Sequence, residues 1–399
     1  MISPHLTRPL ISLRSDDRPS VGGKAAGLGE LAAAGLPVPA GFAITTGAFR
    51  HALQALDPDG AIPRQVGGLP ADDDGAIADV SAQVRSRIVG TPLPARLRDE
   101  IADAYRALPH QPGPGGPDRP GGPDRPDRPD RPDRPDRPDR PDRPDRPDRP
   151  DRPTGDVPVA VRSSATAEDS GSASFAGLQD TYLWVTGADV LAEHVRRCWA
   201  SLYSVESVTY RRHQGVPEDG LAMGVVVQVM VDPRCAGVLF TRSPVTGDTS
   251  VIVVEASWGL GSAVVSGVVT PDTYVVSRVT GEIVKRDVAT KLCHHQRNPS
   301  APGVCLRDVP PALRDVPCLE DGEILALADL GRRVSDHYAT PQDVEWAIHG
   351  GSGPQIVLLQ SRPETVWSSR AASPVAAPTA RAFDHVLHRL SAPGRTAAP

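Results

Sequence analysis

The apolar positions along the chain form two kinds of segment, short β-branched runs and longer stretches with helical spacing. The β-branched runs predict buried strands over residues 159–161, 222–231, 236–240 and 251–255. The helical spacing predicts helices over residues 24–35, 190–212, 320–338 and most of 48–108. Together these elements indicate a chain of mixed α/β class.

The pattern near the end of the chain predicts antiparallel strands. Residues 269–276 and 281–283 suggest a meander, and Gln342–Ile348 and Ile356–Thr365 suggest a hairpin around a glycine-rich turn. In a hairpin, Glu345 and Gln360 can lie on facing strands with their side chains on one side. A carboxylate and an amide oxygen there could bind Mg²⁺, with phosphate oxygens and water completing the octahedron. An ordinary exposed pair is the alternative.

The segment that starts at Val159 carries the first candidate chemistry. Its β-branched residues give way at Arg162 to small hydroxylated residues and glycines. A guanidinium offers a fixed fork of donors to phosphate oxygens, and small residues let backbone N–H groups approach a triphosphate closely. The pattern therefore favours an anion site at Arg162. A polar turn with Arg162 in a surface ion pair is the alternative.

A second candidate phosphate site lies at the start of the helix that Lys24 opens. Gly22 and Gly23 form a flexible turn before it, so the lysine lies where the helix dipole already favours anions. The motif is not a Walker A loop, because the second glycine and the Lys-Ser/Thr pair are missing at the required spacing. A surface lysine on an amphipathic helix is the alternative.

Two further polar residues accompany predicted strands. Gln228 interrupts the apolar run 222–231, so it needs a hydrogen-bond partner if it is buried. Either a cross-strand bond or contact with a nucleotide would supply that partner. Arg242 follows the strand 236–240, so it is a second arginine at the end of a predicted strand.

Composition argues against several classes of protein. The 399 residues carry 43 Lys and Arg against 49 Asp and Glu, a net charge of −6, and no basic tract stands alone. We therefore expect neither nucleic acid nor a membrane as a partner. No apolar run approaches the roughly 20 residues that cross a bilayer. The start, Met1–His5, lacks a secretory signal, so a cytoplasmic protein is expected.

Two segments have compositions that predict disorder. Residues 111–153 combine a Gly/Pro lead-in with repeated Pro-Asp-Arg units and contain no apolar side chains to bury, so we expect an extended or disordered linker. A docking arm for a partner is the alternative. Residues 367–399 are rich in Ala, Pro, Ser and Arg and predict a disordered tail.

Several blocks of sequence occur in the order found in one enzyme family. The blocks are Val21–Lys24, Val161–Asp169, Ser174–Gly177, Gly237–Arg242, Trp258–Gly261 and Leu359–Thr365. In these blocks the chain resembles the N-terminal ATP-binding domain of phosphoenolpyruvate synthase, pyruvate phosphate dikinase and rifampin phosphotransferase. The resemblance implies an ATP-grasp fold, in which two lobes close over ATP and Mg²⁺.

The resemblance also implies a role for each candidate residue. Lys24 and Arg162 correspond to phosphate-binding cations, and Arg242 to a motif near the terminal phosphates. Arg162, Arg242 and Arg362 are the candidate catalytic residues. Catalysis of phosphoryl transfer rests mostly on positioning and charge neutralisation, which a lysine and several arginines can provide.

The remaining correspondences concern the nucleotide and the metal. Gly177 and Thr181 correspond to positions that touch the nucleotide phosphates, and Gln228 to the adenine end. Glu345 and Gln360 correspond to the Mg²⁺ ligands, with Arg362 beside them.

The resemblance divides the chain into lobes and suggests its activity. The first lobe is expected over residues 1–110 and 154–221, and the second over 222–366, with the Mg²⁺-binding hairpin. Two departures stand out: Ser262 replaces the usual glutamate after Gly-Leu-Gly, and the family's phosphorylatable-histidine motif is missing. We therefore expect an ATP-binding phosphotransferase (kinase) domain of the pyruvate, water dikinase type, which cleaves ATP and passes phosphate to a histidine on a separate partner protein. A nucleotide-binding module without catalysis is the alternative.

Overall fold

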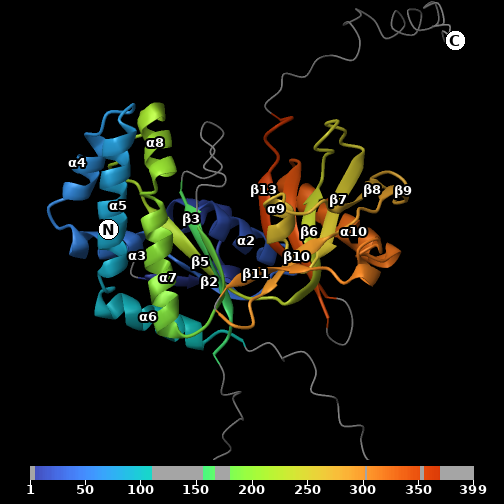
Figure 1. Ribbon diagram of the computed structural model, residues 1–399, viewed down its shortest axis with the longest axis horizontal. Helices are drawn as coiled ribbons and strands as arrows, with labels where there is room; N and C mark the ends of the chain where they lie inside the picture. Colours follow the sequence, from blue (N-terminus) through green and yellow to red (C-terminus); the bar gives the residue numbers. More distant parts are fainter. Residues whose placement is uncertain (1–4, 110–155, 167–179, 302, 351–354, 369–399) are drawn as a thin grey trace, which may run out of the picture. The chain divides into compact units, whose positions relative to one another are not determined.

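The computed structural model describes residues 5–109, 156–166, 180–301, 303–350 and 355–368 (Figure 1). The chain divides into a large unit, Met1–Pro363, and a short unit, Glu364–Pro399. In the short unit, the Glu364 carboxylate accepts hydrogen bonds from the backbone N–H groups of Trp367 and Ser368. The large unit contains a five-stranded sheet, a six-stranded sheet and a two-stranded sheet, which confirms the mixed α/β class.

The first sheet has five strands, and every neighbouring pair is antiparallel. In spatial order the strands are β1 (Thr7–Pro9), β2 (Gly41–Ile44), β5 (Met223–Val229), β3 (Val159–Ala165) and β4 (Thr181–Val185). Every residue of β3 and β5 is buried. Both strands are therefore covered on both faces, as their β-branched sequences predict.

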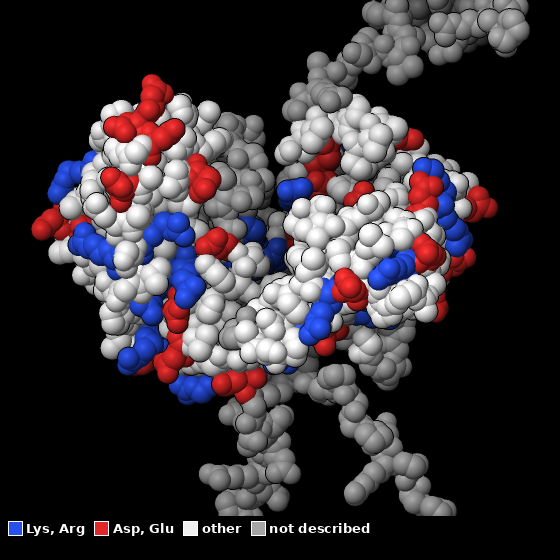
Figure 2. All heavy atoms as spheres, in the orientation of Figure 1, with Lys and Arg blue, Asp and Glu red and all other residues white. Residues whose placement is uncertain are grey.

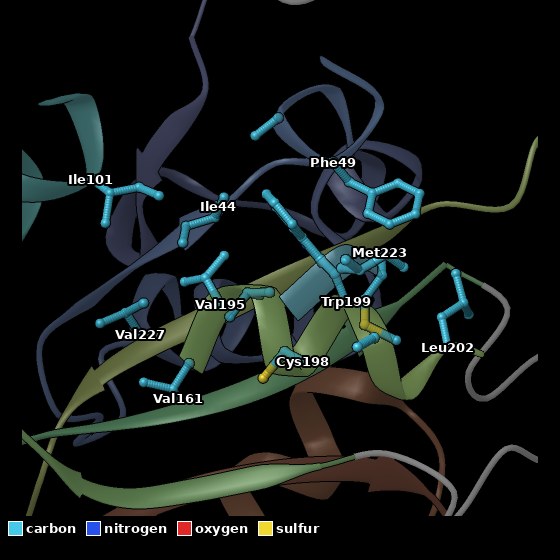
Figure 3. Packing of buried hydrophobic residues seen from close by; sticks show 14 of the residues in the cluster. Ile44, Phe49, Ile101, Val161, Val195, Cys198, Trp199, Leu202, Met223 and Val227 are labelled. Carbon is cyan, nitrogen blue, oxygen red and sulfur yellow. The ribbon is translucent and has the colours of Figure 1, made fainter. Parts of the chain in front are cut away.

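One face of this sheet packs against helices and forms the largest hydrophobic core (Figure 3). The helices are α3 (Thr46–Leu56), α4 (Ala61–Gly67), α5 (Asp74–Gly90), α6 (Ala95–Arg106), α7 (Ala188–Ser201) and α8 (Val205–Gln214). Phe49 of α3 meets Trp199 of α7 edge to face, with ring centroids 5.7 Å apart. Val161 and Val227 supply the strand side of this core.

The prediction of a single helix over residues 190–212 is wrong. The structure has two helices there, α7 and α8, separated by Leu202–Ser204. The break has a local cause, because the Ser204 side chain accepts a hydrogen bond from the backbone N–H of Ser207. Such an N-cap starts a new helix rather than continuing the old one.

The other face of the first sheet is covered by α2 (Gly23–Ala33), which follows the short helix α1 (Arg18–Val21). Leu28 of α2 packs with Ala43 and Val226 of the sheet. The helix also reaches a second core, because Leu31 packs among residues of the six-stranded sheet. A single helix is thus shared between two cores.

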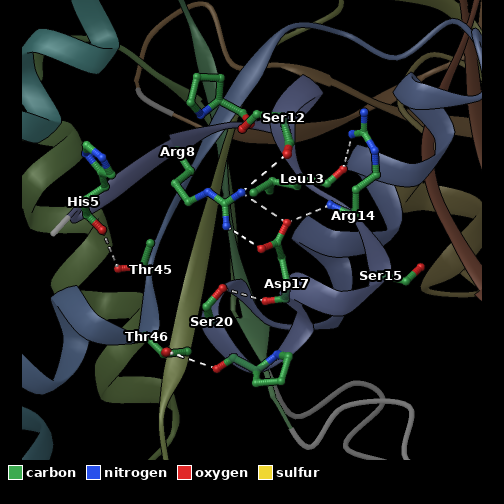
Figure 4. Close-up of polar contacts among 12 residues, drawn as sticks. His5, Arg8, Ser12, Leu13, Arg14, Ser15, Asp17, Ser20, Thr45 and Thr46 are labelled. Carbon is green, nitrogen blue, oxygen red and sulfur yellow. Dashed lines mark hydrogen bonds and ion pairs between the residues drawn. The ribbon is translucent and has the colours of Figure 1, made fainter. Parts of the chain in front are cut away.

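Polar contacts fix the chain just before α2 (Figure 4). This stretch contains the 3₁₀ turns η1 (Leu10–Ser12) and η2 (Ser15–Asp17). The Asp17 carboxylate pairs with the Arg8 guanidinium and accepts a hydrogen bond from the backbone N–H of Arg14 at 3.0 Å. The Ser20 hydroxyl donates to the Asp17 carbonyl at 2.8 Å, and the Thr46 hydroxyl donates to the Pro19 carbonyl at 3.2 Å. These bonds hold the segment that leads into Lys24.

The second sheet has six strands and is also antiparallel throughout. In spatial order its strands are β13 (Gln355–Pro363), β12 (Gln342–His349), β6 (Pro233–Phe240), β7 (Val251–Trp258), β8 (Asp272–Ser277) and β9 (Ile283–Asp287). The helix α10 (Asp321–Tyr338) packs on one face, where Leu327 and Trp346 are fully buried. The predicted hairpin, meander and C-terminal helix are therefore confirmed.

A two-stranded sheet lies beside these elements and was not predicted. Its strands are β10 (Cys293–Arg297) and β11 (Val304–Asp308), and the 3₁₀ turn η3 (Pro311–Leu313) follows. Their side chains are half-buried or exposed. A strand such as Cys-His-His-Gln-Arg has no apolar alternation, so its pattern gives no strand signal.

No helix in the described part of the chain is both long enough and apolar enough to span a bilayer. This agrees with the lack of a membrane-length apolar run in the sequence. The prediction about the linker 111–153 concerns residues outside the described ranges, as do nearly all residues of the predicted tail.

The turn before α2 provides a stability prediction. Gly22 has φ +82°, and a Cβ atom there would lie 1.9 Å from the Ser164 carbonyl oxygen. Gly35, which follows α2, has φ +67° with nothing within 4 Å of such a Cβ. We expect Gly22→Ala to lower the free energy of unfolding by roughly 3 kcal/mol, from backbone strain and overlap together. Gly35→Ala, the matched control, should cost about 1 kcal/mol from strain alone.

Urea denaturation of both variants measures the difference. Equal losses would mean that the close approach of Gly22 to β3 does not constrain the fold.

Candidate functional site

A row of polar side chains crosses the second sheet. Gln360 of β13 lies opposite Glu345 of β12, Glu345 lies opposite Val238 of β6, and Val238 lies opposite Glu255 of β7. Directly paired residues present their side chains on the same face of a sheet. The predicted facing of Glu345 and Gln360 is therefore confirmed, and the row continues to Glu255.

Arg162 of the first sheet reaches this row. Its Nη2 lies 3.1 Å from Glu345 Oε2 and also donates to Gln360 Oε1, while its Nη1 donates to the Leu359 carbonyl at 2.8 Å. Only 9% of the residue is exposed. The alternative of a surface ion pair for Arg162 is therefore wrong, because the guanidinium is buried and joins two sheets.

The row borders a pocket of about 220 Å³. Its apolar lining comes from Val238 and Phe240 of β6 and from Val264 and Val265 of α9 (Ser262–Val265). Its polar lining consists of Glu255, Asp343, Glu345, Gln360 and Arg362. A pocket with an apolar floor and a few convergent charged groups is typical of a small-molecule site.

Arg362 lies two residues beyond Gln360 along β13, so its side chain is on the same face. Its Nε is 3.3 Å from Asp343 Oδ2, and 46% of its side chain is exposed. The structure thus places Arg362 beside the Glu345–Gln360 pair, with its guanidinium accessible at the pocket.

Backbone contacts bring Thr181 and the start of α2, where Lys24 lies, near Arg162. Thr181 of β4 is the direct partner of Arg162 on β3. Gly22 packs against the Ser164 backbone, and the Ser164 hydroxyl accepts a hydrogen bond from the backbone N–H of Ala25 at 3.1 Å. The start of α2, where Lys24 lies, is therefore held at the end of β3 that follows Arg162.

The lining of the pocket lacks five of the predicted site residues that the structure describes: Lys24, Arg162, Thr181, Gln228 and Arg242. Gln228 and Arg242 have hydrogen-bond partners elsewhere. Gln228 is 2% exposed, and its Nε2 donates to the Pro39 carbonyl at 3.4 Å, as in the hydrogen-bond alternative. Arg242 follows β6, and its Nε donates to the Gly247 carbonyl within its own turn. Neither residue lines the pocket. Gly177 lies outside the described residues.

Glu255 and Asp343 line the pocket and were not among the predicted site residues. Asp343 has Arg362 as its partner, whereas no side chain in the described ranges donates a hydrogen bond or pairs with Glu255. Burial raises the pKa of the Glu255 carboxyl above its usual value. In the sequence, Glu255 is recognisable only as a charged residue at the end of an apolar strand. Which residues lie beside it in the sheet depends on the order of the strands.

Ser262, which replaces the usual glutamate, has a partner of its own. Its hydroxyl lies 2.9 Å from Nδ1 of His295 on β10. Burial and the neighbouring His294 lower the pKa of His295, so the neutral ring is favoured. Ser262 therefore ties α9 to the two-stranded sheet.

A larger hollow of about 420 Å³ lies beside β1 and β2. Its lining is apolar except for Thr7 and includes Leu10, Phe42 and Leu108. A triphosphate needs cationic and hydrogen-bonding groups, so this hollow does not suit one despite its size.

The row offers few oxygen atoms that could bind a metal ion. No group of three or more His, Cys, Asp or Glu poised for a metal occurs among the described residues. Mg²⁺ bound with a nucleotide usually takes only one or two protein ligands, and phosphates and water supply the rest. The carboxylate of Glu345 and the amide oxygen of Gln360 suit that ion, and a guanidinium already lies against both.

Charges of both signs share the face of the described residues that Figure 2 shows. Figure 2 shows acidic and basic side chains interspersed over the visible face of the described residues.

A family model matches most of the chain. The model is described as the pyruvate phosphate dikinase AMP/ATP-binding domain, and it matches residues 18–115 and 148–382. The gap between the two matched parts falls inside the Pro-Asp-Arg segment.

Curated relatives have similar sequences over almost the whole chain. A protein named "Probable phosphoenolpyruvate synthase" from Methanothermobacter thermautotrophicus is 39% identical over 353 residues, which are 88% of this chain and 45% of that protein. A phosphoenolpyruvate synthase from Aeropyrum pernix is 37% identical over 90% of this chain and 42% of its own length. A rifampicin phosphotransferase from Streptomyces is 38% identical over 86% and 34% respectively. The chain thus spans less than half the length of these relatives.

The contacts of Arg162 give a second stability prediction. A lysine keeps the charge, but it cannot donate to Glu345, Gln360 and the Leu359 carbonyl from one planar fork. We expect Arg162→Lys to lower the free energy of unfolding by about 2 kcal/mol, because half-buried acceptors lose their donors. Arg362→Lys is the matched control, and at a half-exposed ion pair it should change stability by less than about 1 kcal/mol.

Urea denaturation measures the free energy of unfolding of both variants. If Arg162→Lys were as stable as the wild type, the contacts between the sheets would not depend on the guanidinium.

Proposed function

Because the chain belongs to the family of pyruvate phosphate dikinase AMP/ATP-binding domains, we propose that it binds Mg·ATP at the pocket on the second sheet and uses it as a phosphoryl donor. The observation that carries this proposal is the convergence of Arg162, Glu345 and Gln360. These residues come from sequence positions far apart, and their cation, carboxylate and amide are the groups that phosphoryl transfer requires.

The proposed fold is an ATP-grasp arrangement. Residues 1–110 and 154–221 would form the first lobe around the five-stranded sheet, and residues 222–366 the second lobe around the six-stranded sheet. Support comes from the separate cores of the two sheets and from the family match on both sides of residues 116–147. The segment 111–153 would be an insertion that leaves both cores intact.

Each candidate residue has a proposed role. Lys24, Arg162 and Arg362 would neutralise phosphate oxygens, while Glu345 and Gln360 would bind Mg²⁺, which draws negative charge off the phosphates. Arg162 would exchange partners in this step, because its guanidinium rests on the two oxygens that the metal needs. Its move from carboxylate to phosphate keeps the charge paired throughout.

The remaining proposed site residues lie around this centre. Thr181 and Gly177 would contact phosphates near Arg162, and Arg242 would approach the terminal phosphates after leaving its own turn. Gln228 would mark the adenine end. Its hydrogen bond to Pro39 suits a positioning role better than direct contact.

The phosphate acceptor is proposed to be a histidine outside this chain. The supporting relatives are named phosphoenolpyruvate synthase and rifampicin phosphotransferase, and they extend well beyond the matched region. ATP would be cleaved to AMP, with one phosphoryl group transferred to the histidine and the other transferred to water and released as inorganic phosphate.

Calorimetry with Mg·ATP tests binding. We expect Lys24→Met and Glu345→Gln each to weaken binding about tenfold or more, because each removes a charged contact to the nucleotide or its metal. Lys285→Met is the control, since its ammonium pairs with Asp287 at the exposed strand β9. Unchanged affinity in both site variants would place the nucleotide elsewhere.

Transfer is tested with ATP labelled at the β- or γ-phosphate. The chain is incubated with Mg²⁺ and labelled ATP, with and without a cell lysate, and both AMP and labelled protein are measured. AMP together with an acid-labile phosphohistidine on another protein supports the transferase. Tight ATP binding without AMP under every condition would instead favour a nucleotide-binding module without catalysis.

A further inference from the structure

A small cavity among the helices that cover the first sheet is lined by two side-chain donors without acceptors. Its volume is about 30 Å³, and its lining comes from α3, α5, α7 and the segment that follows α5. Arg196 and Trp199 of α7 both line it. The guanidinium Nε of Arg196 and the indole Nε1 of Trp199 are buried, and neither has a hydrogen-bond partner among the described residues. Only 2% of Trp199 is exposed, so its N–H group is desolvated.

Both donors are held in place on one face of α7. Residues three positions apart are neighbours on a helix surface, so the side chains of Arg196 and Trp199 lie side by side. The indole is fixed by packing, because its ring meets Phe49 of α3 edge to face (Figure 3). The guanidinium is fixed by its Nη1, which donates to the carbonyls of Val89 and Thr91 at the end of α5. The two free N–H groups are therefore preorganised.

The cavity carries a positive charge without a carboxylate. No acidic residue lines it, and Arg196 forms no ion pair within the part of the chain that the structure describes. The acidic residue nearest to Arg196 along α7, Glu193, pairs with Arg197 at 2.6 Å instead. A guanidinium among apolar groups is costly unless a counter-ion or further acceptors accompany it.

An anion suits this cavity better than water does. A cavity needs about 10–15 Å³ to hold one water molecule, so this one has room for about two waters or a single halide ion. A buried water must donate hydrogen bonds as well as accept them. The one hydroxyl in the lining, that of Thr91, already donates to the Arg87 carbonyl at 2.8 Å. An anion only accepts, so two N–H donors and a positive charge match its needs.

We propose that this cavity binds chloride, held by the Nε–H of Arg196 and the Nε1–H of Trp199. The site is separate from the proposed nucleotide pocket, because the two share no lining residue. The ion would complete the contacts of the arginine that ties α7 to the end of α5. Chloride would thus stabilise the helices that cover the first sheet.

Thermal unfolding of the full chain in sodium chloride and in sodium gluconate, at one fixed ionic strength, tests the site. Gluconate is too large for the cavity. We expect chloride to raise the unfolding temperature of the wild type by roughly 3 °C for each tenfold increase above its dissociation constant. Trp199→Phe keeps an aromatic ring against Phe49 but removes the donor, so it should lose most of this response. Trp346→Phe is the matched control, since it removes an equally buried, unpartnered indole N–H from the second core; it should respond as the wild type does.

Chloride NMR gives a readout that does not depend on stability, because exchange with a bound site broadens the signal of the free ion. We expect the wild type and Trp346→Phe to broaden it, and Trp199→Phe and Arg196→Lys to reduce the broadening severalfold. Arg196→Lys keeps the charge but lacks the Nε donor. Equal broadening by all four proteins, or a wild-type unfolding temperature that is the same in both salts, would overturn the proposal. Neither result bears on nucleotide binding.

Discussion

The guanidinium of Arg162 is the interaction on which the geometry of the site depends. It leaves β3 of the first sheet and serves acceptors on β12 and β13 of the second. With 9% of the residue exposed, its charge must stay paired. Removing one of the half-buried acceptors would leave the buried guanidinium with fewer partners, which is more costly than the net value of the contact.

The helix beside Arg162 is fixed by packing on two sides. The helix α2 contributes Leu28 to one core and Leu31 to another, so packing on two sides fixes it. Its first turn lies against Ser164 so closely that only glycine fits at position 22. Lys24 is therefore positioned by helix packing and backbone contact rather than by a loop, which suits a site that must match a charged ligand closely.

The sequence predicts local features of the site better than long-range ones. Period-two alternation and a glycine-rich turn were sufficient to place Glu345 opposite Gln360, because a hairpin is a local structure. Nothing in the local pattern around Arg162 reports that it meets residues nearly two hundred positions later. That contact depends on how two sheets meet, and the family resemblance only assigned both groups of residues to the same nucleotide site.

The wrong and missing predictions have similar physical causes. The strand β10 carries no apolar alternation because it is half-exposed on both faces, so hydrophobic periodicity could not find it. The break between α7 and α8 is marked by one serine hydroxyl, a weaker signal than the apolar positions on either side. Glu255 was visible as a charge in a strand, but its relation to Glu345 requires the order of β12, β6 and β7.

The pocket also shows why net charge is a poor guide to phosphate binding. The chain carries a net charge of −6 and its surface mixes both signs, yet the chain belongs to a nucleotide-binding family. At physiological ionic strength charges act over about 8 Å, so a bound triphosphate responds to its immediate neighbours rather than to the whole protein. In the proposed site the charges alternate in sign: Arg162 lies against Glu345, and Arg362 lies against Asp343. Such an arrangement can hold anionic phosphates and the cations that travel with them at once, which a uniformly basic patch cannot do, because it would repel the metal.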